Sequence, residues 1–178
     1  DFAILSATTT STNQNTWIEE MKKQIKDFPG LNLVTTVYGD DLADKSYREA
    51  NGLLTSQPNV KVIVAPTTVG VLAASQAVKD AGKIGEVYVT GLGLPSEMAG
   101  AIKSGATKEF AIWNPIDLGY SATQIAYRLV KGETDGAPGS EIEAGRMGKI
   151  KVGDNGEAAM ADPFVYDASN IDQFSKIF

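Results

Sequence analysis

Short apolar runs and amphipathic segments alternate along the chain. The apolar runs cover residues 2–5, 31–37, 60–65, 86–90 and 110–113, and each has the length of one strand. Between and after them, apolar residues recur at helical spacing, which predicts helices over about residues 17–28, 44–56, 68–81, 95–104 and 115–131. Strand followed by helix, repeated in this way, predicts an α/β fold with a mainly parallel sheet inside a three-layer αβα sandwich.

Individual residues mark the ends of these predicted helices. Gly82 and Gly132 suit the position just after a helix, because glycine readily takes the left-handed conformation found there. Asn114 can cap the helix that Pro115 begins. Asp117 stands where the acid of a capping box would reach back. The fifth helix therefore has the clearest predicted start.

Other segments are read in the same way. Asp40 and Asp41 suit the N-terminus of the second helix, because acids are favourable there. Beyond the fifth helix, residues 133–145 are rich in glycine, proline and acids and predict a loop. Residues 149–152 predict one more strand, and Ser169 is expected to cap a short last helix.

The charge and the missing residue types narrow the chemistry. The 178 residues include 16 basic and 22 acidic ones, which gives a net charge of −6, and the sequence has no histidine and no cysteine. Disulfides, thiolate zinc sites, cysteine nucleophiles and histidine-dependent catalysis are thereby excluded. An acidic chain also argues against a surface that tracks nucleic-acid phosphates. We expect no cofactor, no metal and no nucleic-acid partner.

Candidate binding groups lie in the loops after the predicted strands, because open parallel sheets bind ligands at the carboxyl ends of their strands. The loop over residues 6–15 is rich in hydroxyls and amides and has no charge; Pro66, Thr67 and Thr68 follow the third strand, and Trp113 and Asn114 the fifth. Neutral donors and acceptors beside an indole suit an uncharged, polyhydroxylated ligand. A sugar fits this inventory better than an anion.

Simpler structural roles stand beside that interpretation. The hydroxyls and amides of residues 6–15 also suit capping and turn formation. Trp17 falls on the apolar face of its predicted helix and favours the core, whereas Trp113 suits either packing or ligand contact. Asn114 is first of all a helix cap, although a cap can also contact a ligand.

Motifs for other chemistries are weak or missing from the sequence. Gly91-Leu92-Gly93 lacks the third glycine of a dinucleotide fingerprint and is interpreted as a turn. Residues 40–44 contain three aspartates but neither the glycine nor the distal glutamate of a calcium loop, so we interpret them as a solvated helix start. No spacing selects a carboxylate pair for glycoside hydrolysis, and we expect no catalytic residue.

Several segments, taken together, resemble one protein family. They are Ala-Ile-Leu-Ser-Ala, Thr-Asn-Gln-Asn-Thr-Trp-Ile, Val-Tyr-Gly-Asp-Asp, Ala-Pro-Thr-Thr-Val-Gly, Thr-Gly-Leu-Gly-Leu-Pro and Glu-Ala-Gly-Arg-Met-Gly-Lys. Their order resembles the second lobe of periplasmic sugar-binding proteins of ABC importers. Within that family the chain looks most like the branch of rhamnose-binding and autoinducer-2-binding proteins, with rhamnose the closer match. The resemblance covers essentially the whole chain.

The resemblance implies a ligand site as well as a fold. A type I periplasmic binding protein closes two α/β lobes on a sugar, and this chain resembles one of them. The ligand-binding residues that the resemblance implies are Asn13, Gln14, Pro66, Thr67, Thr68, Trp113 and Asn114. Many members have an aspartate after the fourth strand, where this sequence has Gly91-Leu92-Gly93. This departure favours a deoxysugar or a small furanose-like ligand.

The resemblance also implies a domain organisation. Residues 1–112 would form the main part of the ligand-binding C-terminal lobe, residues 113–146 would cross into the N-terminal lobe, and residues 147–178 would return. The N-terminal lobe would be missing, so the chain is expected to be a fragment. The helix face that this lobe would cover is then open, which predicts repacking, self-association or mobility. Its residues are Leu118, Ala122, Ile125 and Leu129.

The implied partners are a small, neutral, rhamnose-like sugar and, through the full-length protein, the membrane permease of an ABC importer. The implied location is the periplasm, or the outside of a Gram-positive cell with a lipid anchor. Three alternatives stay open: an autoinducer-2 receptor of the same family, the effector-binding domain of a sugar-responsive transcription regulator, and a sugar-processing hydrolase. The lack of a catalytic inventory argues against the hydrolase.

Overall fold

The structure is a computed structural model that describes residues 1–177. The chain forms two compact units, and each is described by itself. Unit 1 comprises Asp1–Ala111 and the residues from Val165 onward, and unit 2 comprises Ile112–Phe164. The chain therefore passes from one unit to the other twice, so that unit 2 is an insertion within unit 1.

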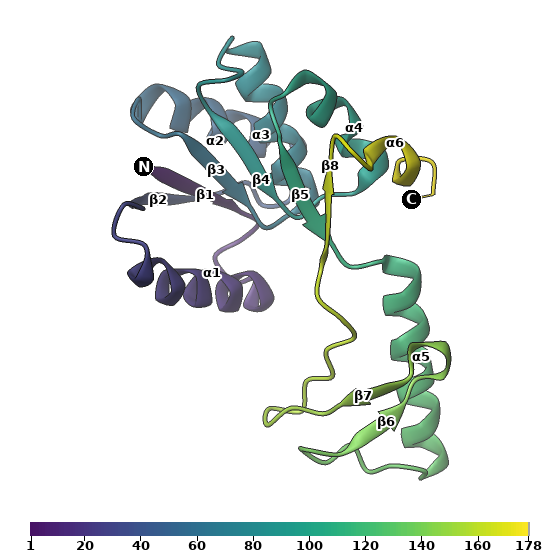
Figure 1. The fold of residues 1–178 in the computed structure, drawn as a ribbon. Coiled ribbons are helices and arrows are strands. Elements are labelled where there is room, and N and C mark those ends of the chain that lie inside the picture. Colours follow the sequence, from purple (N-terminus) through teal and green to yellow (C-terminus); the bar gives the residue numbers. More distant parts are fainter. Residues whose placement is uncertain (178) are drawn as a thin grey trace. The chain divides into compact units, whose positions relative to one another are not determined.

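Unit 1 is built on a parallel sheet, as the alternation of strands and helices predicts. Its strands are β1 (Phe2–Ser6), β2 (Leu33–Tyr38), β3 (Val62–Ala65) and β4 (Tyr88–Gly91). They lie in the order β2-β1-β3-β4, and each pairs in parallel with its neighbours (Figure 1). Strand β2 thus lies on one side of β1, and β3 lies on the other.

Helices cover both faces of this sheet, which completes the predicted three layers. They are α1 (Thr12–Gln24) with a 3-10 turn η1 (Ile25–Asp27), α2 (Ala43–Ser56), α3 (Thr68–Asp80) and α4 (Pro95–Ser104). Figure 1 shows α1 on one side of the sheet and α2 and α3 on the other. The predicted spans of α2, α3 and α4 are confirmed to within a residue or so.

The first helix departs from its prediction at both ends. It begins at Thr12, ahead of the apolar spacing that starts at Trp17, and its last turn tightens into η1 before Phe28. Phe28 is 53% exposed, so its predicted place on the buried face is wrong. The face that packs on the sheet is carried by Ile18, with Met21 and Ile25 beside it.

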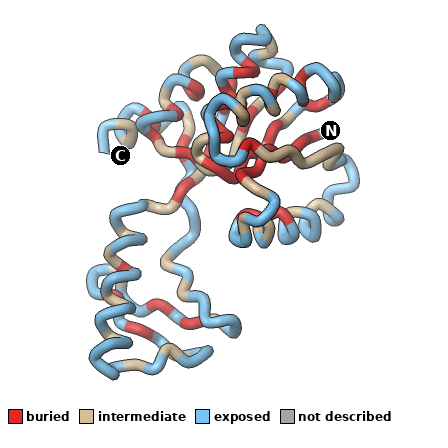
Figure 2. The backbone as a smooth tube through the Cα atoms, turned by 180° about the vertical axis from the view of Figure 1, so that it is seen from behind, coloured by how far each residue is buried: buried red, intermediate tan, exposed pale blue. Residues whose placement is uncertain are grey.

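The core of unit 1 lies on both faces of its sheet, and Figure 2 shows buried backbone at the centre of this unit. Ile4, Leu5 and Ile63 from the strands are completely buried. Small residues let α3 approach closely, because Ala74 and Ala77 are also completely buried. Burial of each large aliphatic side chain stabilises the fold by roughly 1.5–3 kcal/mol. The strand ends are therefore held on a rigid base.

Unit 1 ends in a pair of strands from distant parts of the sequence. Strand β5 (Glu109–Ile112) pairs with β8 (Phe164–Asp167), and helix α6 (Ile171–Phe174) follows. The ring of Tyr166 stacks on Phe110 at 5.3 Å and meets Phe174 edge-on at 5.2 Å. Ser169 does not cap α6, contrary to prediction: its backbone N–H and hydroxyl donate to Asp167, and Asn170 occupies the cap position.

Unit 2 consists of helix α5 (Pro115–Lys131) with a small antiparallel pair, β6 (Glu141–Glu143) and β7 (Lys149–Lys151), and the 3-10 turn η2 (Gly145–Met147) between them. Strand β7 confirms its prediction, whereas β6 lies inside the segment predicted as a loop. Residues 147–164 belong to unit 2 together with residues 112–146. The assignment of these segments to lobes of a larger protein stays a prediction.

The start of α5 follows its prediction in part. The Asn114 carboxamide oxygen accepts from the backbone N–H groups of Ile116 and Asp117, so the predicted cap is confirmed. Asp117 takes another partner than the capping box would give it: its carboxylate accepts from the Arg146 guanidinium at 2.6 Å. The same guanidinium lies 3.9 Å from the centre of the Tyr120 ring. Asp117 therefore ties the turn η2 to α5.

Candidate functional site

The strand order creates a natural opening at the carboxyl edge of the sheet. Strands β1 and β3 are neighbours, but the helix after β1 covers one face and the helix after β3 covers the other. The loops that follow these two strands therefore diverge, and such a switch point is where open α/β sheets bind ligands. Five of the predicted site residues lie in these two loops or in the helix turns that follow them.

Gln14 ties the start of α1 to the end of β1. Its side-chain oxygen accepts from the Ser6 hydroxyl at 2.7 Å and from the Ala7 backbone N–H at 2.9 Å. The Ala7 backbone N–H can only donate, so the Gln14 side-chain atom that faces it must be the oxygen, Oε1. The side-chain nitrogen, Nε2, then has no hydrogen-bond partner among the described residues. Gln14 is only 7% exposed, so most of its side chain serves the fold.

Asn13 and the loop before it are more open. Asn13 is exposed, and its side-chain oxygen accepts from the Gln14 backbone N–H at 2.9 Å. Ser11 occupies the cap position of α1 without capping it, because its hydroxyl bonds with Thr8. Part of the hydroxyl-rich loop is thus turn chemistry, while the Asn13 side-chain nitrogen stays available as a donor within the described residues.

The loop after β3 divides into buried and accessible groups. Pro66 and Thr67 are buried, and Thr68 is half-buried. The Thr67 hydroxyl accepts weakly from the Gly70 backbone N–H at 3.5 Å and donates to the Asp41 carboxylate. Thr67 is therefore the cap of α3, and its polar atom is in use. The Thr68 hydroxyl has no partner among the described residues and remains available.

The loop after β2 takes part in this edge, which the sequence alone did not indicate. Asp40 and Asp41 both have left-handed backbones, with φ of 54° and 52°. The Asp40 carboxylate accepts from Lys45 at 2.6 Å, and Leu42 occupies the cap position of α2. Both aspartates are exposed, so the predicted solvated start is confirmed, but neither caps α2, and the Asp41 carboxylate accepts from Thr67 instead. Among the described residues, no group of three or more acids could hold a metal ion.

The glycines after β4 permit close packing. A Cβ on Gly91, whose φ is +147°, would lie 1.9 Å from the Ala65 carbonyl oxygen. A Cβ on Gly93 would lie 2.7 Å from the Met98 side chain. These contacts give both glycines a packing role on either side of Leu92. The loop brings α4 and β5 against the strands.

Trp113 and Asn114 belong to unit 2. The Trp113 indole N–H donates to the Ala161 carbonyl at 2.9 Å, and Asn114 caps α5. Both polar side chains therefore have structural partners inside their own unit. The other five predicted residues belong to unit 1 and lie at one edge of its sheet. Trp113 and Asn114 belong to the other unit.

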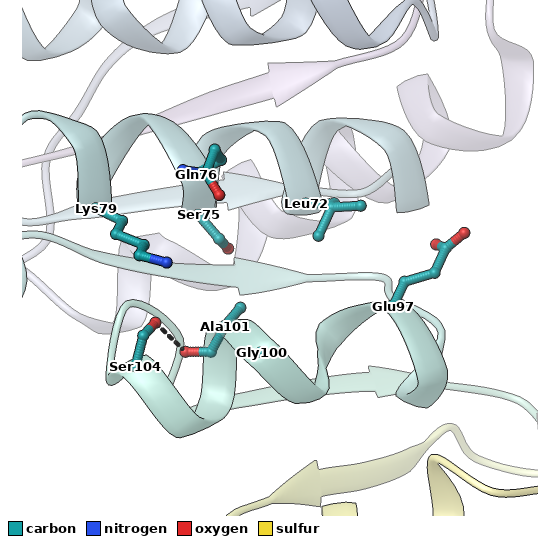
Figure 3. A pocket seen from close by; sticks show the side chains of 8 residues that line it. All are labelled: Leu72, Ser75, Gln76, Lys79, Glu97, Gly100, Ala101 and Ser104. Carbon is teal, nitrogen blue, oxygen red and sulfur yellow. Dashed lines mark hydrogen bonds between the residues drawn. The ribbon is translucent and has the colours of Figure 1, made fainter.

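Two hollows lie between the helices on one face of unit 1. A groove of about 210 Å³ separates α3 from α4, with Leu72, Gln76 and Lys79 on one wall and Glu97 on the other (Figure 3). A larger groove of about 520 Å³ lies between α2 and α3, and Thr68 is one of its lining residues. The narrower groove contains none of the predicted site residues. No helix among residues 1–177 is long and apolar enough to cross a bilayer.

The resolved shifts in pKa concern residues other than the seven predicted ones. The Lys103 ammonium beside Asp172 lowers the pKa of that carboxyl group, and hydrogen bonds from Ser169 lower the pKa of Asp167. Burial raises the pKa of the Tyr166 phenol. The predicted contacts themselves are neutral amides, hydroxyls, an indole and a proline. The predicted contacts are therefore suited to hydrogen bonding.

Solved structures with clear sequence similarity share this fold. A sugar ABC transporter protein from Actinomyces odontolyticus is 41% identical over 97% of this chain and 56% of that one, with a TM-score of 0.82. An ABC transporter solute-binding protein from Clostridium phytofermentas, solved with bound L-rhamnose, is 40% identical over 100% of this chain and 60% of that one, with a TM-score of 0.93. The chain thus spans little more than half the length of each.

More distant structures share the fold alone. LsrB from Clostridium saccharobutylicum, solved in complex with AI-2, is 19% identical over 97% of this chain and 58% of that one, with a TM-score of 0.86. The family model described as the periplasmic binding protein domain matches residues 1–134. This match, together with the two structures at about 40% identity, shows that the chain belongs to the periplasmic binding protein family.

Proposed function

We propose that this chain is the sugar-binding part of the solute-binding component of an ABC importer, with a rhamnose-like deoxysugar as ligand. The observation that carries the proposal is the set of neutral hydrogen-bonding groups in the loops after β1 and β3, at the switch point of the sheet. Amide and hydroxyl groups without partners among the described residues, on Asn13, Gln14 and Thr68, suit sugar hydroxyls. The L-rhamnose bound to the related Clostridium phytofermentas protein supports the choice of sugar.

The proposed function is binding without a chemical step. The ligand would be held by neutral hydrogen bonds, and a second lobe would close over it. The permease of the importer is the proposed partner, and the periplasm, or the outer surface of a Gram-positive cell, is the proposed location. Membership of a family of binding proteins supports this assignment over the hydrolase. An upstream helix-turn-helix would instead favour the transcription regulator.

The first test is a nitrogen-15 chemical-shift titration with L-rhamnose, with D-galactose as the control sugar. It is made on the 178-residue chain and on the longest natural chain that contains it. We expect selective shifts for the amides of Asn13, Gln14 and Thr68 with L-rhamnose. No response to L-rhamnose in the longer chain would contradict the proposal.

Autoinducer-2 is the second ligand to test, because LsrB from Clostridium saccharobutylicum was solved in complex with AI-2. The same titration with autoinducer-2 separates the two ligands. Tight binding of autoinducer-2 with no response to L-rhamnose would keep the family role and replace the ligand.

The substitution Thr68→Val should weaken binding of the cognate ligand by about 1 kcal/mol, because one hydroxyl partner is lost.

A further inference from the structure

The loop after β2 connects the two loops that hold the proposed contacts. On one side, the Gly39 backbone N–H donates to the Ser6 carbonyl at 2.9 Å, and the Ser6 hydroxyl in turn donates to Gln14. On the other side, Asp41 accepts from the Thr67 hydroxyl. Residues 39–41 thus link the end of β1, to which the start of α1 is bonded, with the start of α3.

The bond between Asp41 and Thr67 spans an unusual distance in the sheet. Strands β2 and β3 are not neighbours, because β1 lies between them. With about 4.8 Å between adjacent strands, the ends of β2 and β3 are roughly 10 Å apart. The loop after β2 therefore has to reach over the end of β1 before Asp41 can meet Thr67.

The backbone of this loop is bent in a way that achieves the reach. Asp40 and Asp41 take φ of 54° and 52°, in the left-handed region that few residues other than glycine occupy. Such a conformation is unfavourable unless its surroundings compensate. The Asp40 backbone N–H donates to the Ala7 carbonyl at 2.7 Å, and the Asp41 carboxylate accepts from Thr67, so both residues are held in this conformation.

Asp41 also controls the side chain that begins α3. The Gly70 backbone N–H reaches the Thr67 hydroxyl at only 3.5 Å, which is a weak cap. A hydrogen bond to a carboxylate is the stronger of the two and fixes the Thr67 rotamer. The methyl group of Thr67 then lies above Gly70, where a Cβ would come within 2.6 Å of it. Thr67 is thereby locked, and Thr68 is placed by the same turn.

We propose that Asp41 is a positioning residue for ligand binding. It does not touch the ligand: it holds residues 66–68 at a fixed distance from the loop after β1 by bonding to Thr67 across the end of that strand. The inference rests on the proposed function for its effect on affinity. Its effect on the geometry of the loop after β3 can be measured without any sugar.

The test compares two glycine substitutions in one turn. Glycine accepts the left-handed conformation, so Asp41→Gly and Asp40→Gly both keep the backbone while removing one carboxylate. We expect Asp41→Gly to raise the Kd for L-rhamnose about 10-fold, because Thr67 loses its charged partner. Asp40→Gly removes only an exposed ion pair and should change the Kd less than about 2-fold. Asp41→Asn keeps an acceptor and tolerates the left-handed region, so it should restore most of the affinity.

A second variant and a sugar-free measurement complete the test. Thr67→Val removes the donor, so adding Asp41→Gly to it should weaken binding no further. Without sugar, the amide shifts of Thr67, Thr68 and Gly70 should move in Asp41→Gly and return in Asp41→Asn. Unchanged amide shifts in Asp41→Gly would overturn the positioning role, whether or not sugar binds. A wild-type protein that ignores L-rhamnose, with these amide shifts altered as expected, would overturn the proposed ligand alone.

Discussion

Asn13 and Gln14 are neighbours in the sequence, yet their side chains have opposite surroundings. Asn13 is exposed, whereas Gln14 is buried and accepts two hydrogen bonds from the end of β1. The resemblance to sugar-binding proteins assigned both residues to the ligand. It could not tell which amide atoms the fold already uses, since that depends on how α1 packs on β1.

Stability measurements should separate the two amides. Gln14→Leu leaves the Ser6 hydroxyl and the Ala7 N–H without their acceptor in a buried place, so it should lower the free energy of unfolding by about 1–3 kcal/mol. Asn13→Ala, one position away, should change it by less than about 0.5 kcal/mol. Urea denaturation of the two variants checks the difference, and equal losses would contradict this division of roles.

Tyr166 gives a prediction about pH. Burial raises the pKa of its phenol, so folding favours the protonated form. The stability from this group is complete below its ordinary value of about 10 and is lost as the pH rises through the raised value. Above about pH 10, wild-type protein should therefore lose stability more steeply than Tyr166→Phe. Urea denaturation of both proteins at increasing pH measures the difference, and parallel curves would argue against it.

Among the elements, the strands and most helices of unit 1 follow the sequence pattern closely. Pro95 begins α4, and Gly105 and Gly132, with φ of 82° and 71°, end α4 and α5. These residues restrict the backbone locally, so their effect is visible in the sequence. Strand β6 was missed because its three residues are only one edge of a hairpin among glycines and charges.

The element least visible in the sequence is the turn after β2. Its important contact, from Asp41 to Thr67, joins residues 26 positions apart. Which carboxylate reaches across depends on strand order, and strand order is a property of the folded sheet. The same reason applies to Arg146, which finds Asp117 from 29 positions away. Local sequence patterns predict helices and strands, whereas contacts between distant residues depend on how these elements are arranged in the fold.

Two glycines should respond oppositely to alanine. Gly91→Ala forces a Cβ to within 1.9 Å of the Ala65 carbonyl oxygen at a φ of +147°, so it should destabilise unit 1 by more than about 3 kcal/mol or prevent folding. Gly100→Ala places a Cβ in open space inside α4, so it should stabilise by about 0.5–1 kcal/mol. Thermal unfolding of both variants tests the pair, and a stable Gly91→Ala protein would contradict the account of the β4 loop.

At the scale of the whole molecule, the exposed apolar residues of α5 bear on association in solution. Leu118 and Leu129 are 50% and 42% exposed and line an apolar groove of about 310 Å³ within unit 2. Exposed apolar surface of this kind favours association. Of the four residues that the resemblance implies would be uncovered, Leu118, Ala122 and Leu129 are exposed and Ile125 is half-buried.

Sedimentation velocity should reveal concentration-dependent association of the 178-residue chain. Leu118→Glu places a charge in the groove and should shift the chain toward monomer. Ile116→Glu is the matched control, because Ile116 is 58% exposed but does not line the groove. A chain that stays monomeric at all concentrations, or variants that behave alike, would argue against this face as the cause.

The double passage of the chain between units has a consequence for protein engineering. Strand β5 ends at Ile112 and β8 begins at Phe164, the two strands are hydrogen-bonded neighbours, and Figure 1 shows the chain leaving β5 and entering β8 at the same end. Residues 113–163 should therefore be replaceable by a short Asn-Gly turn. The amide chemical shifts of unit 1 should be retained in the shortened protein, because the turn would join β5 and β8 directly into a hairpin.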